Sequence, residues 1–346
     1  MRSFYMGSVK DLEVLVAPAG EYPGRGRFIF SDRYSVFDWG EMPDHIPQKG
    51  SALCIVAAYF FEKLESNGIL THYLGVVEDG QIKTLSELDK AVNVLETKLY
   101  RVLHPKLIKN VYDYEIYNQE KGNYLIPLEI IYRNTLPRGS SVFKRLEKGE
   151  LKLKDLGLNN MPGEGVELDH PYLDVSTKLE ESDRYLSWQE AREISNLSEQ
   201  KIGELNAITL RVNQMISKEV KKAGLKNEDG KFEFALDQNQ NIVLVDVLGT
   251  LDECRFTYQG MPISKEIPRL YYRKSEWYTE ILKAKEIDKV NWKDNVKGNP
   301  KPLPLELKLL ISRVYQAFAN EITGKEWFSD IPPLQEILKD MKHFIK

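Results

Sequence analysis

Cysteine and histidine are scarce in this chain: 346 residues include only Cys54 and Cys254 and five scattered histidines. Two cysteines cannot form a disulfide framework or a multi-cysteine metal site, so a reducing compartment, the cytoplasm, fits best. The histidines show no HxxH or HExxH spacing, which disfavours a structural zinc site. The N-terminus has no apolar segment after a basic start, and residues 51–61 are too short to span a bilayer. We therefore expect no signal peptide and no membrane partner.

The chain also has no excess of charge of one sign. Its 48 basic and 52 acidic side chains give a net charge of −4. A general nucleic-acid binder would show a basic excess or stripe, so we expect no nucleic-acid partner, although local basic pockets for phosphates remain compatible. The apolar content of 42% is that of a soluble globular protein, with length for two domains or one large α/β unit.

Residues 24–50 are the densest in groups that bind small anions. They begin as an apolar strand and continue as a turn-rich segment interrupted by glycine and proline. A strand followed by a charged loop often carries functional side chains, but a solvated surface loop is the commoner case. The groups in question are Arg25, Arg27, Asp32, Arg33, Ser35, Asp38, Asp44 and Lys49. We expect Asp32 and Arg33 mainly to shape the loop.

Hydrophobic periodicity predicts the main elements. Ser187 and Ser198 are candidate N-caps of two consecutive helices within 187–222, with Glu190 at the capping-box offset from Ser187. Two amphipathic tail helices should pack on the body of the protein. Helices are predicted at 51–67, 187–222, 305–322 and 332–345, and strands at 10–16, 24–30, 75–79, 92–102, 124–133, 231–236 and 242–247, with strand plus loop at 106–122.

Three segments carry candidate chemistry. Glu233 and Asp246 lie on the two strands of a predicted hairpin, where two carboxylates can converge on a magnesium ion or can simply face solvent. Residues 139–149 begin with Gly-Ser-Ser and then become basic, which is typical of a phosphate site. The apolar strand 124–133 could offer its backbone to an adenine ring or be plain core, and Pro127 marks an interruption or an edge.

Ordered blocks along the chain resemble the phosphoribosylaminoimidazole-succinocarboxamide synthase (SAICAR synthetase) family. The blocks are FSDR at 30–33 through Asp38, PD at 43–44, IPQKG at 46–50, YRN at 132–134 with GS at 139–140 and KR at 144–145, STK at 176–178 with EE at 180–181 and Asp183, KFEF at 231–234 with Asp246, and Asp252 with CRF at 254–256.

The chain departs from the family pattern at several positions. Ser8 stands where the family often has a lysine, and Val247 where it has glutamate. There is an extra stretch within 72–121 and a long C-terminal tail. A divergent paralogue that makes another amide from ATP, and a non-catalytic nucleotide-binding protein, are the alternative hypotheses.

The resemblance implies an α+β fold with ATP in a cleft between two lobes. The expected parts are an N-terminal lobe with an antiparallel sheet (1–126), an ATP-grasp-like C-terminal lobe (127–275) and extra C-terminal helices (276–346). It also implies an ATP-dependent ligase of purine biosynthesis. The family joins carboxyaminoimidazole ribonucleotide (CAIR) to L-aspartate through an acyl phosphate, and the enzyme could be a homo-oligomer.

The site residues implied by the resemblance fall into groups. Glu233 and Asp246 would hold Mg²⁺. The nucleotide would be bound by Gly7, Ser8, Lys10, Lys231 and the strand containing Asn123 and Ile126. The substrates would be bound by Ser35, Asp38, Lys49, Arg133, Ser140, Ser176, Thr177 and Arg255. The catalytic candidates are Asp38, Lys178 and Asp183, and either Asp38 or Asp183 could be the general base.

Overall fold

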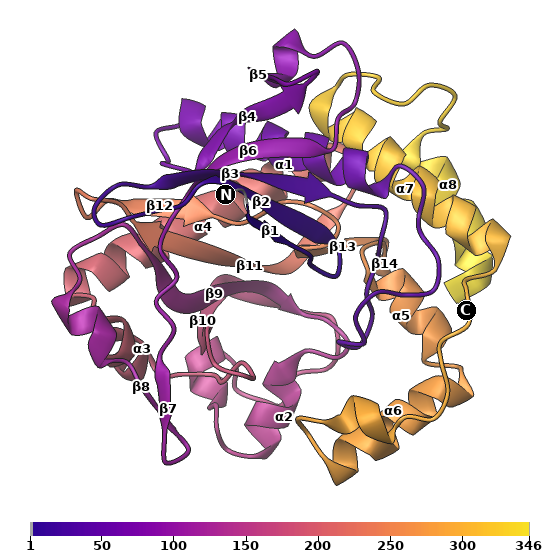
Figure 1. Ribbon diagram of the computed structural model, residues 1–346. Helices are drawn as coiled ribbons and strands as arrows, with labels where there is room; N and C mark the ends of the chain where they lie inside the picture. The colour runs from indigo at the N-terminus through magenta and orange to yellow at the C-terminus, as the bar shows by residue number, and fades with distance from the viewer. Residues whose placement is uncertain (1–2, 346) are drawn as a thin grey trace.

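Two antiparallel sheets organise the computed structural model, which describes residues 3–345 (Figure 1). The first sheet has the strand order β1 (Ser3–Tyr5), β2 (Lys10–Val16), β3 (Gly24–Phe30), β6 (Val94–Leu99), β4 (Tyr73–Glu78) and β5 (Gln81–Lys83). The second has the order β10 (Val166–Thr177), β9 (Tyr124–Leu136), β11 (Lys226–Leu236), β13 (Cys254–Tyr258) and β14 (Met261–Pro262), and β12 (Ile242–Val245) also pairs with β11. A separate hairpin joins β7 (Lys106–Ile108) to β8 (Val111–Asp113).

Eight helices occur among the described residues: α1 (Lys49–Ser66), α2 (Ser141–Glu147), α3 (Trp188–Ser195), α4 (Glu199–Lys222), α5 (Glu266–Tyr272), α6 (Glu276–Ile287), α7 (Leu305–Thr323) and α8 (Leu334–Ile345). Helix α1 packs on β3, β4 and β6 of the first sheet, and α4 packs on β9 and β11 of the second. Helix α7 lies against both α1 and α4, and α8 covers α7 (Figure 1). Within residues 3–345, no helix is both long and apolar enough to cross a membrane.

Strand β9 is an interior, buried strand of the second sheet, as its apolar sequence predicted, although the middle position belongs to β11. It has 13 residues, most of them buried, and pairs with β10 on one side and β11 on the other. Its register with β11 shifts between the pairs Glu129–Glu233 and Leu125–Ala235, and Pro127 lies between them. A proline cannot donate to the ladder, so the interruption expected at this residue is confirmed.

Backbone hydrogen bonds join strands of the second sheet to the segments just before β4 and just after β6 of the first. Leu244 of β12 donates to Leu70 O (2.9 Å), and Leu125 of β9 donates to Arg101 O (2.9 Å). One apolar cluster includes residues of both sheets and of the helices between them, such as Phe61 and Phe318. The lobes therefore share one core, and the three-part division of the chain stays a prediction.

The local signals in the sequence predicted most elements. The 10–16 and 24–30 strands form the expected hairpin, and Ser187 and Ser198 cap α3 and α4 with Asn196 between them in a left-handed conformation (φ 53°). The tail helices pack on the body as expected. Strand β6 is shorter than the predicted 92–102, because its pairing with β3 and β4 ends at Leu99.

Candidate active site

The loop after β3 is held in place by two of its own charged residues. Asp32 accepts hydrogen bonds from the backbone N–H groups of Gln48 (3.1 Å) and Gly50 (2.9 Å), which caps the start of α1. Arg33 pairs with Asp11 and donates to Gly7 O (3.1 Å). A Cβ at Gly50 would lie 2.7 Å from Phe30 O, so only glycine lets α1 begin this close to β3. The structural role expected for Asp32 and Arg33 is confirmed.

This loop forms one wall of a small cavity of about 200 Å³, which we call the loop cavity. Lys49 lies at its base, 1% exposed, with Nζ 2.7 Å from Asp252 Oδ2. Asp38 lies at its mouth in a left-handed conformation (φ 64°), 3.2 Å from Lys285 Nζ. The cavity thus brings together the predicted residues Ser8, Ser35, Asp38 and Lys49, and adds Asp252, Lys265, Arg269 and Tyr315.

Asp252 is the anionic partner of Lys49. Burial by itself would raise the pKa of this carboxyl, but the ammonium groups of Lys49 and Lys265 and the hydrogen bonds to Lys49 and Tyr315 lower it below its usual value. An ion pair buried this deeply is stable only when the remaining hydrogen-bonding groups are satisfied. A bound anion could meet the remaining donors of Lys49.

A second cavity, of about 570 Å³, lies where the two sheets meet; we call it the inter-sheet cavity. Lys10, Leu12 and Val14 point into it from one face of β2, so its wall changes from charged to apolar along that strand. Phe28, paired with Leu12, extends the apolar part. The charged end includes Lys10, Lys178, Glu233 and Asp246, and the apolar part includes Leu12, Val14, Phe28, Leu99, Leu125 and Val245. An apolar slot with a charged end suits a molecule with a flat base and an anionic tail.

Lysines and carboxylates alternate at the charged end. Lys178 Nζ lies 2.7 Å from Glu233 Oε1 and 3.0 Å from Glu129 Oε1. Lys231 Nζ contacts the same two oxygens at 3.3 and 2.6 Å, and Lys10 pairs with Asp246. Three positive and three negative groups therefore balance one another in this cluster.

The pKa values show how strongly these groups depend on one another. Burial by itself would lower the pKa of Lys178 and of Lys231, but the carboxylates of Glu233 and Glu129 raise both above the usual value. The pKa of Glu233 is raised, first by burial and then by the charge of Asp246. The pKa of Asp246 is lowered despite burial, because Lys10 lies against it. Glu233 and Asp246 thus repel each other across the cavity.

This pair of carboxylates fits Mg²⁺ in number and type. Among the described residues, no group of three or more His, Cys, Asp or Glu side chains could hold a metal by itself. Magnesium usually takes one or two carboxylates, with water and phosphate oxygens completing its shell. Since the lysines are already balanced by carboxylates, a polyphosphate in this cavity would need a further cation.

Three arginines form a separate cluster beside the second sheet. Arg133 is 2% exposed and reaches Asp174 (3.3 Å), Asp229 (3.5 Å) and Ser140 Oγ (3.5 Å). Arg255 Nε donates to Asp229 (2.6 Å). In the described part of the chain, Arg133 Nε is buried without an acceptor. With Arg145 also paired to Asp174, three cations face two carboxylates, which favours an anionic ligand.

Asp183 lines neither of the two cavities. Solvent reaches its side chain, yet its pKa is raised, first by partial desolvation and then by the Glu129 carboxylate, with a smaller contribution from Asp38. Lys178 and Lys231 act in the opposite direction. The charges of Glu129, Lys178, Lys231 and Asp38 therefore all act on Asp183.

Other predicted residues lie outside the two cavities. Asn123 turns its side chain to Gly20 O and Tyr22 O, and Ile126 is buried in the core. The backbone of 123–128 was expected to bind adenine, but β11 and Arg101 already pair with much of it. Ser176 and Thr177 are buried, and Thr177 Oγ1 accepts from the Arg184 N–H. Gly7 is exposed, and its N–H donates to Asp11.

Sequence reasoning missed Glu129, His72 and Tyr315. Glu129 is the only charged residue in the apolar run before Arg133, and a lone carboxylate in a buried strand was an available signal. His72 Nε2 lies 3.0 Å from Asp246 O, and burial lowers its pKa to about 4, so the ring is neutral at pH 7. Nothing local marked His72 or Tyr315, because both reach the site from distant segments.

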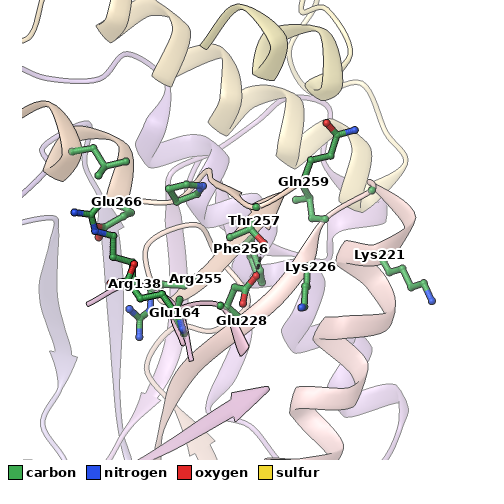
Figure 2. Close-up of a pocket in the computed structure, with 17 residues that line it drawn as sticks. Arg138, Glu164, Lys221, Lys226, Glu228, Arg255, Phe256, Thr257, Gln259 and Glu266 are labelled. Carbon is green, nitrogen blue, oxygen red and sulfur yellow. Dashed lines mark hydrogen bonds between the residues drawn. The ribbon is translucent and has the colours of Figure 1, made fainter. Parts of the chain in front are cut away.

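A cavity of about 880 Å³, the outer cavity, is larger than either of these (Figure 2). It lies around the ends of β9, α4 and β13, and Figure 2 shows Arg138, Glu164, Arg255 and Glu266 on one side and Lys221 and Gln259 on the other. Of the predicted residues, only Arg255 lines it. Size alone does not indicate chemistry, so we place the candidate site at the two smaller cavities, where the charged groups converge.

Comparisons with known proteins all indicate the same family. A family model described as SAICAR synthetase matches residues 4–284. The chain is 52% identical over 341 residues to a putative phosphoribosylaminoimidazole-succinocarboxamide synthase of Archaeoglobus fulgidus, covering 99% of this chain and 100% of the relative. It is 31% identical to the enzyme of that name from Thermoplasma acidophilum, covering 87% and 93%.

Solved structures share the fold. A SAICAR synthase from Saccharomyces cerevisiae, complexed with SAICAR, aligns with a TM-score of 0.61 at 22% identity over 93% of this chain and 94% of that one. A type-2 SAICAR synthetase in complex with ADP aligns with a TM-score of 0.55 at 22% identity, over 87% and 100%. At this identity the likeness supports the mixed α+β fold, with its antiparallel sheets and helices.

Proposed function

The chain belongs to the SAICAR synthetase family, and we propose that its cleft uses ATP to join CAIR to L-aspartate, giving SAICAR, ADP and phosphate. This is an ATP-dependent ligase reaction of purine biosynthesis. The observation that carries the proposal is the convergence of Glu233, Asp246, Lys10 and Lys178 at one end of an apolar slot, with Lys231 paired to Glu233. A second cavity, which holds Lys49, lies beside this slot.

The chemistry explains why the site needs so many charges. A carboxylate is a poor acyl donor, because its leaving group would be oxide. An oxygen of the CAIR carboxylate attacks the γ-phosphorus of ATP, ADP leaves, and an acyl phosphate forms. The amine of aspartate then attacks the acyl carbon, phosphate leaves, and a base takes the amine proton. Phosphoryl transfer depends mainly on positioning and on neutralising charge.

ATP binds in the inter-sheet cavity in this proposal. The base lies against the apolar side chains of Leu12, Val14 and Leu125. The phosphates point to Lys10 and toward Lys231, which does not line the cavity but pairs with its Glu233. Ser8 lines the neighbouring loop cavity, so the turn from Gly7 to Lys10 separates the two ligands. A Cβ at Gly7 would lie 2.3 Å from Lys10 O, which keeps this turn tight.

Glu233 and Asp246 would hold Mg²⁺ together with the phosphates of the nucleotide. The ion would neutralise phosphate charge during transfer, a role that fits the mutual repulsion of these two carboxylates. Lys178 opposes the rise in the pKa of Glu233, since its ammonium lies 2.7 Å from that carboxylate.

CAIR is proposed to span from the loop cavity to the arginine cluster. Lys49, with Ser35 and Asp38 at the mouth of the cavity, would contact the imidazole end, and Arg133, Ser140 and Arg255 would take the anionic groups. Ser176 and Thr177 would support the aspartate site from the end of β10.

Asp183 is the better candidate for the base that accepts the amine proton. Its raised pKa makes it more basic than an ordinary aspartate, and it lies near Lys178 and Asp38. Asp38 is the alternative, although its side chain is 85% exposed and paired with Lys285.

The test is ADP release by the purified chain with Mg²⁺, ATP, CAIR and L-aspartate, with each component omitted in turn. Release that requires all four supports the proposal. Release with another acid or amine instead would identify a paralogue with a shifted substrate. Nucleotide binding without turnover under any combination would identify a non-catalytic nucleotide-binding protein.

The cellular location and the binding partners are part of the same proposal. We expect a cytoplasmic enzyme of small-molecule substrates without a nucleic-acid or membrane partner, which could be a homo-oligomer. Both cysteines are free and buried, and the overall charge lacks the basic excess that is typical of nucleic-acid binders.

A further inference from the structure

Helix α7 reaches the loop cavity from outside the part of the chain that matches the family model. That match ends at residue 284, whereas α7 spans Leu305–Thr323. Figure 1 shows α7 alongside α1, and the two helices pack against each other. Since α1 begins at Lys49, α7 approaches the base of the loop cavity, and its Tyr315 lines that cavity.

Tyr315 and Lys49 share one carboxylate. The hydroxyl of Tyr315 donates to Asp252 Oδ1 at 2.6 Å, and Lys49 Nζ lies 2.7 Å from Asp252 Oδ2. The ammonium also lies 5.6 Å from the centre of the Tyr315 ring. The tyrosine therefore occupies one oxygen of Asp252 and leaves the other to the lysine.

Lys49 has unused donors. An ammonium carries three N–H groups, and within residues 3–345 its one hydrogen-bond acceptor is Asp252. The side chain is 1% exposed, so water satisfies little of it. A buried cation with unpaired donors beside a cavity favours an anionic ligand oxygen there.

We infer that Tyr315 is a positioning residue for the imidazole nucleotide: by holding Asp252 Oδ1, it keeps Asp252 from binding Lys49 with both oxygens and leaves the ammonium available to the ligand. This inference rests on the proposed function. Burial and the neighbouring Asp252 raise the pKa of Tyr315, so the hydroxyl keeps its proton and acts as a donor across the physiological range.

Without the hydroxyl of Tyr315, the buried oxygen Asp252 Oδ1 would lose the hydrogen bond that it now accepts. Asp252 would then draw Lys49 toward itself and away from the cavity. The ring of phenylalanine would still fill the same space against Lys49, so the packing of α7 would be kept. The affinity for the imidazole nucleotide should therefore fall. The inter-sheet cavity should be unaffected, because Tyr315 does not line it.

The experiment compares Tyr315→Phe with wild type by steady-state kinetics and by calorimetric binding of CAIR. A lost hydrogen bond to a charged group should raise the KM and Kd for CAIR by about 10- to 100-fold. The KM for ATP should change by less than about twofold, which a general structural defect would not produce. An unchanged Kd for CAIR, or an equal rise in both KM values, would overturn the inference.

Two controls separate the hydroxyl from the helix. Tyr117→Phe removes another buried hydroxyl, which donates to Leu103 O at 2.6 Å and lines neither cavity, so it should leave both KM values unchanged. Ser312→Ala removes a contact that fixes α7 to Pro47 O (2.6 Å) one turn earlier. If Ser312→Ala raised the KM for CAIR as selectively as Tyr315→Phe, the docking of α7 would explain the effect and positioning by Tyr315 would be refuted.

A failure of the proposed function would give a different result from a failure of the inference about Tyr315. Wild-type protein that releases no ADP with CAIR and aspartate would refute the proposed function, and binding of CAIR could still be compared between wild type and Tyr315→Phe. Wild-type protein that neither turns over nor binds CAIR would overturn both.

Discussion

The two cavities differ in what builds them. The inter-sheet cavity is lined by strands β2, β3, β11 and β12, whose positions are set by backbone hydrogen bonds. The loop cavity is lined by a loop, the start of α1 and helices α5 and α7, which side-chain contacts such as Tyr315–Asp252 hold together. A ligand site built from strands can be traced in the sequence, whereas one assembled from distant side chains depends on the whole fold.

This difference predicts that substitutions in the two cavities change different kinetic parameters. The largest effect should come from Glu233→Gln, which removes a proposed magnesium ligand. We expect kcat to fall by about 100- to 1000-fold, because the charge of the transferring phosphoryl group would be poorly neutralised. Lys178 and Lys231 keep Glu129 as a partner, so the fold should persist by circular dichroism. Exposed Glu167→Gln is the control, and turnover near wild type in Glu233→Gln would refute the metal assignment.

Lys10→Met should have the next largest effect and should act only on the nucleotide. It removes a proposed phosphate contact and leaves Asp246 without its ion pair. The KM for ATP should rise by about 10- to 100-fold, and the KM for CAIR should stay within about twofold. Initial rates at varied concentrations of each substrate would measure both. If the two KM values rose together, the two cavities could not be treated as separate binding sites.

Lys285→Ala is a milder change at the mouth of the loop cavity. In the ion pair between Lys285 and Asp38, the Asp38 side chain is 85% exposed, and pairs at the surface contribute about 0–1 kcal/mol. We therefore expect the KM for CAIR to rise by no more than about fivefold and the KM for ATP to stay unchanged. Lys283→Ala, an exposed residue of the same helix, is the matched control. A rise in the KM for ATP alone would contradict the proposed place of Asp38.

Glu219→Gln should change stability and neither KM value, since Glu219 lines neither cavity. Burial by itself would raise its pKa, but hydrogen bonds from Lys222, Tyr59 and Lys63 lower it to about 2. A carboxylate held below its usual pKa of 4.5 stabilises the fold above that pH, and the effect is lost as pH falls toward 2.

Urea unfolding at pH 7 should show a loss of about 2–3 kcal/mol in the free energy of unfolding of the Glu219→Gln variant. The difference should shrink below about pH 4.5; a loss that does not depend on pH would count against this ionised contact.

The parts predicted from the sequence were those with local causes. The β2–β3 hairpin follows from alternation and a turn, and the caps at Ser187 and Ser198 from short-range spacing. The convergence of Glu233 and Asp246 followed from one hairpin. Each of these features involves residues close together in the chain, where periodicity and turn residues determine the geometry.

The parts that were not predicted depend on distant contacts. The position of β6 between β3 and β4 joins segments far apart in the chain. The periodicity of α7 shows that one face is buried but not that Tyr315 on it meets Asp252. The Asn123 side chain holds the turn between β2 and β3 through Gly20 O and Tyr22 O, contacts over 103 and 101 residues of sequence that no local pattern indicates. Which distant residues come into contact depends on the complete fold.

The central claim is that two neighbouring cavities receive two different nucleotides. The most direct measurement is a crystal structure of the protein with Mg²⁺, ADP and CAIR. We predict ADP in the inter-sheet cavity, with its base against Leu12 and Val14, and CAIR beside Lys49 in the loop cavity. ADP in the outer cavity of Figure 2, or CAIR without contact to Lys49, would contradict the account.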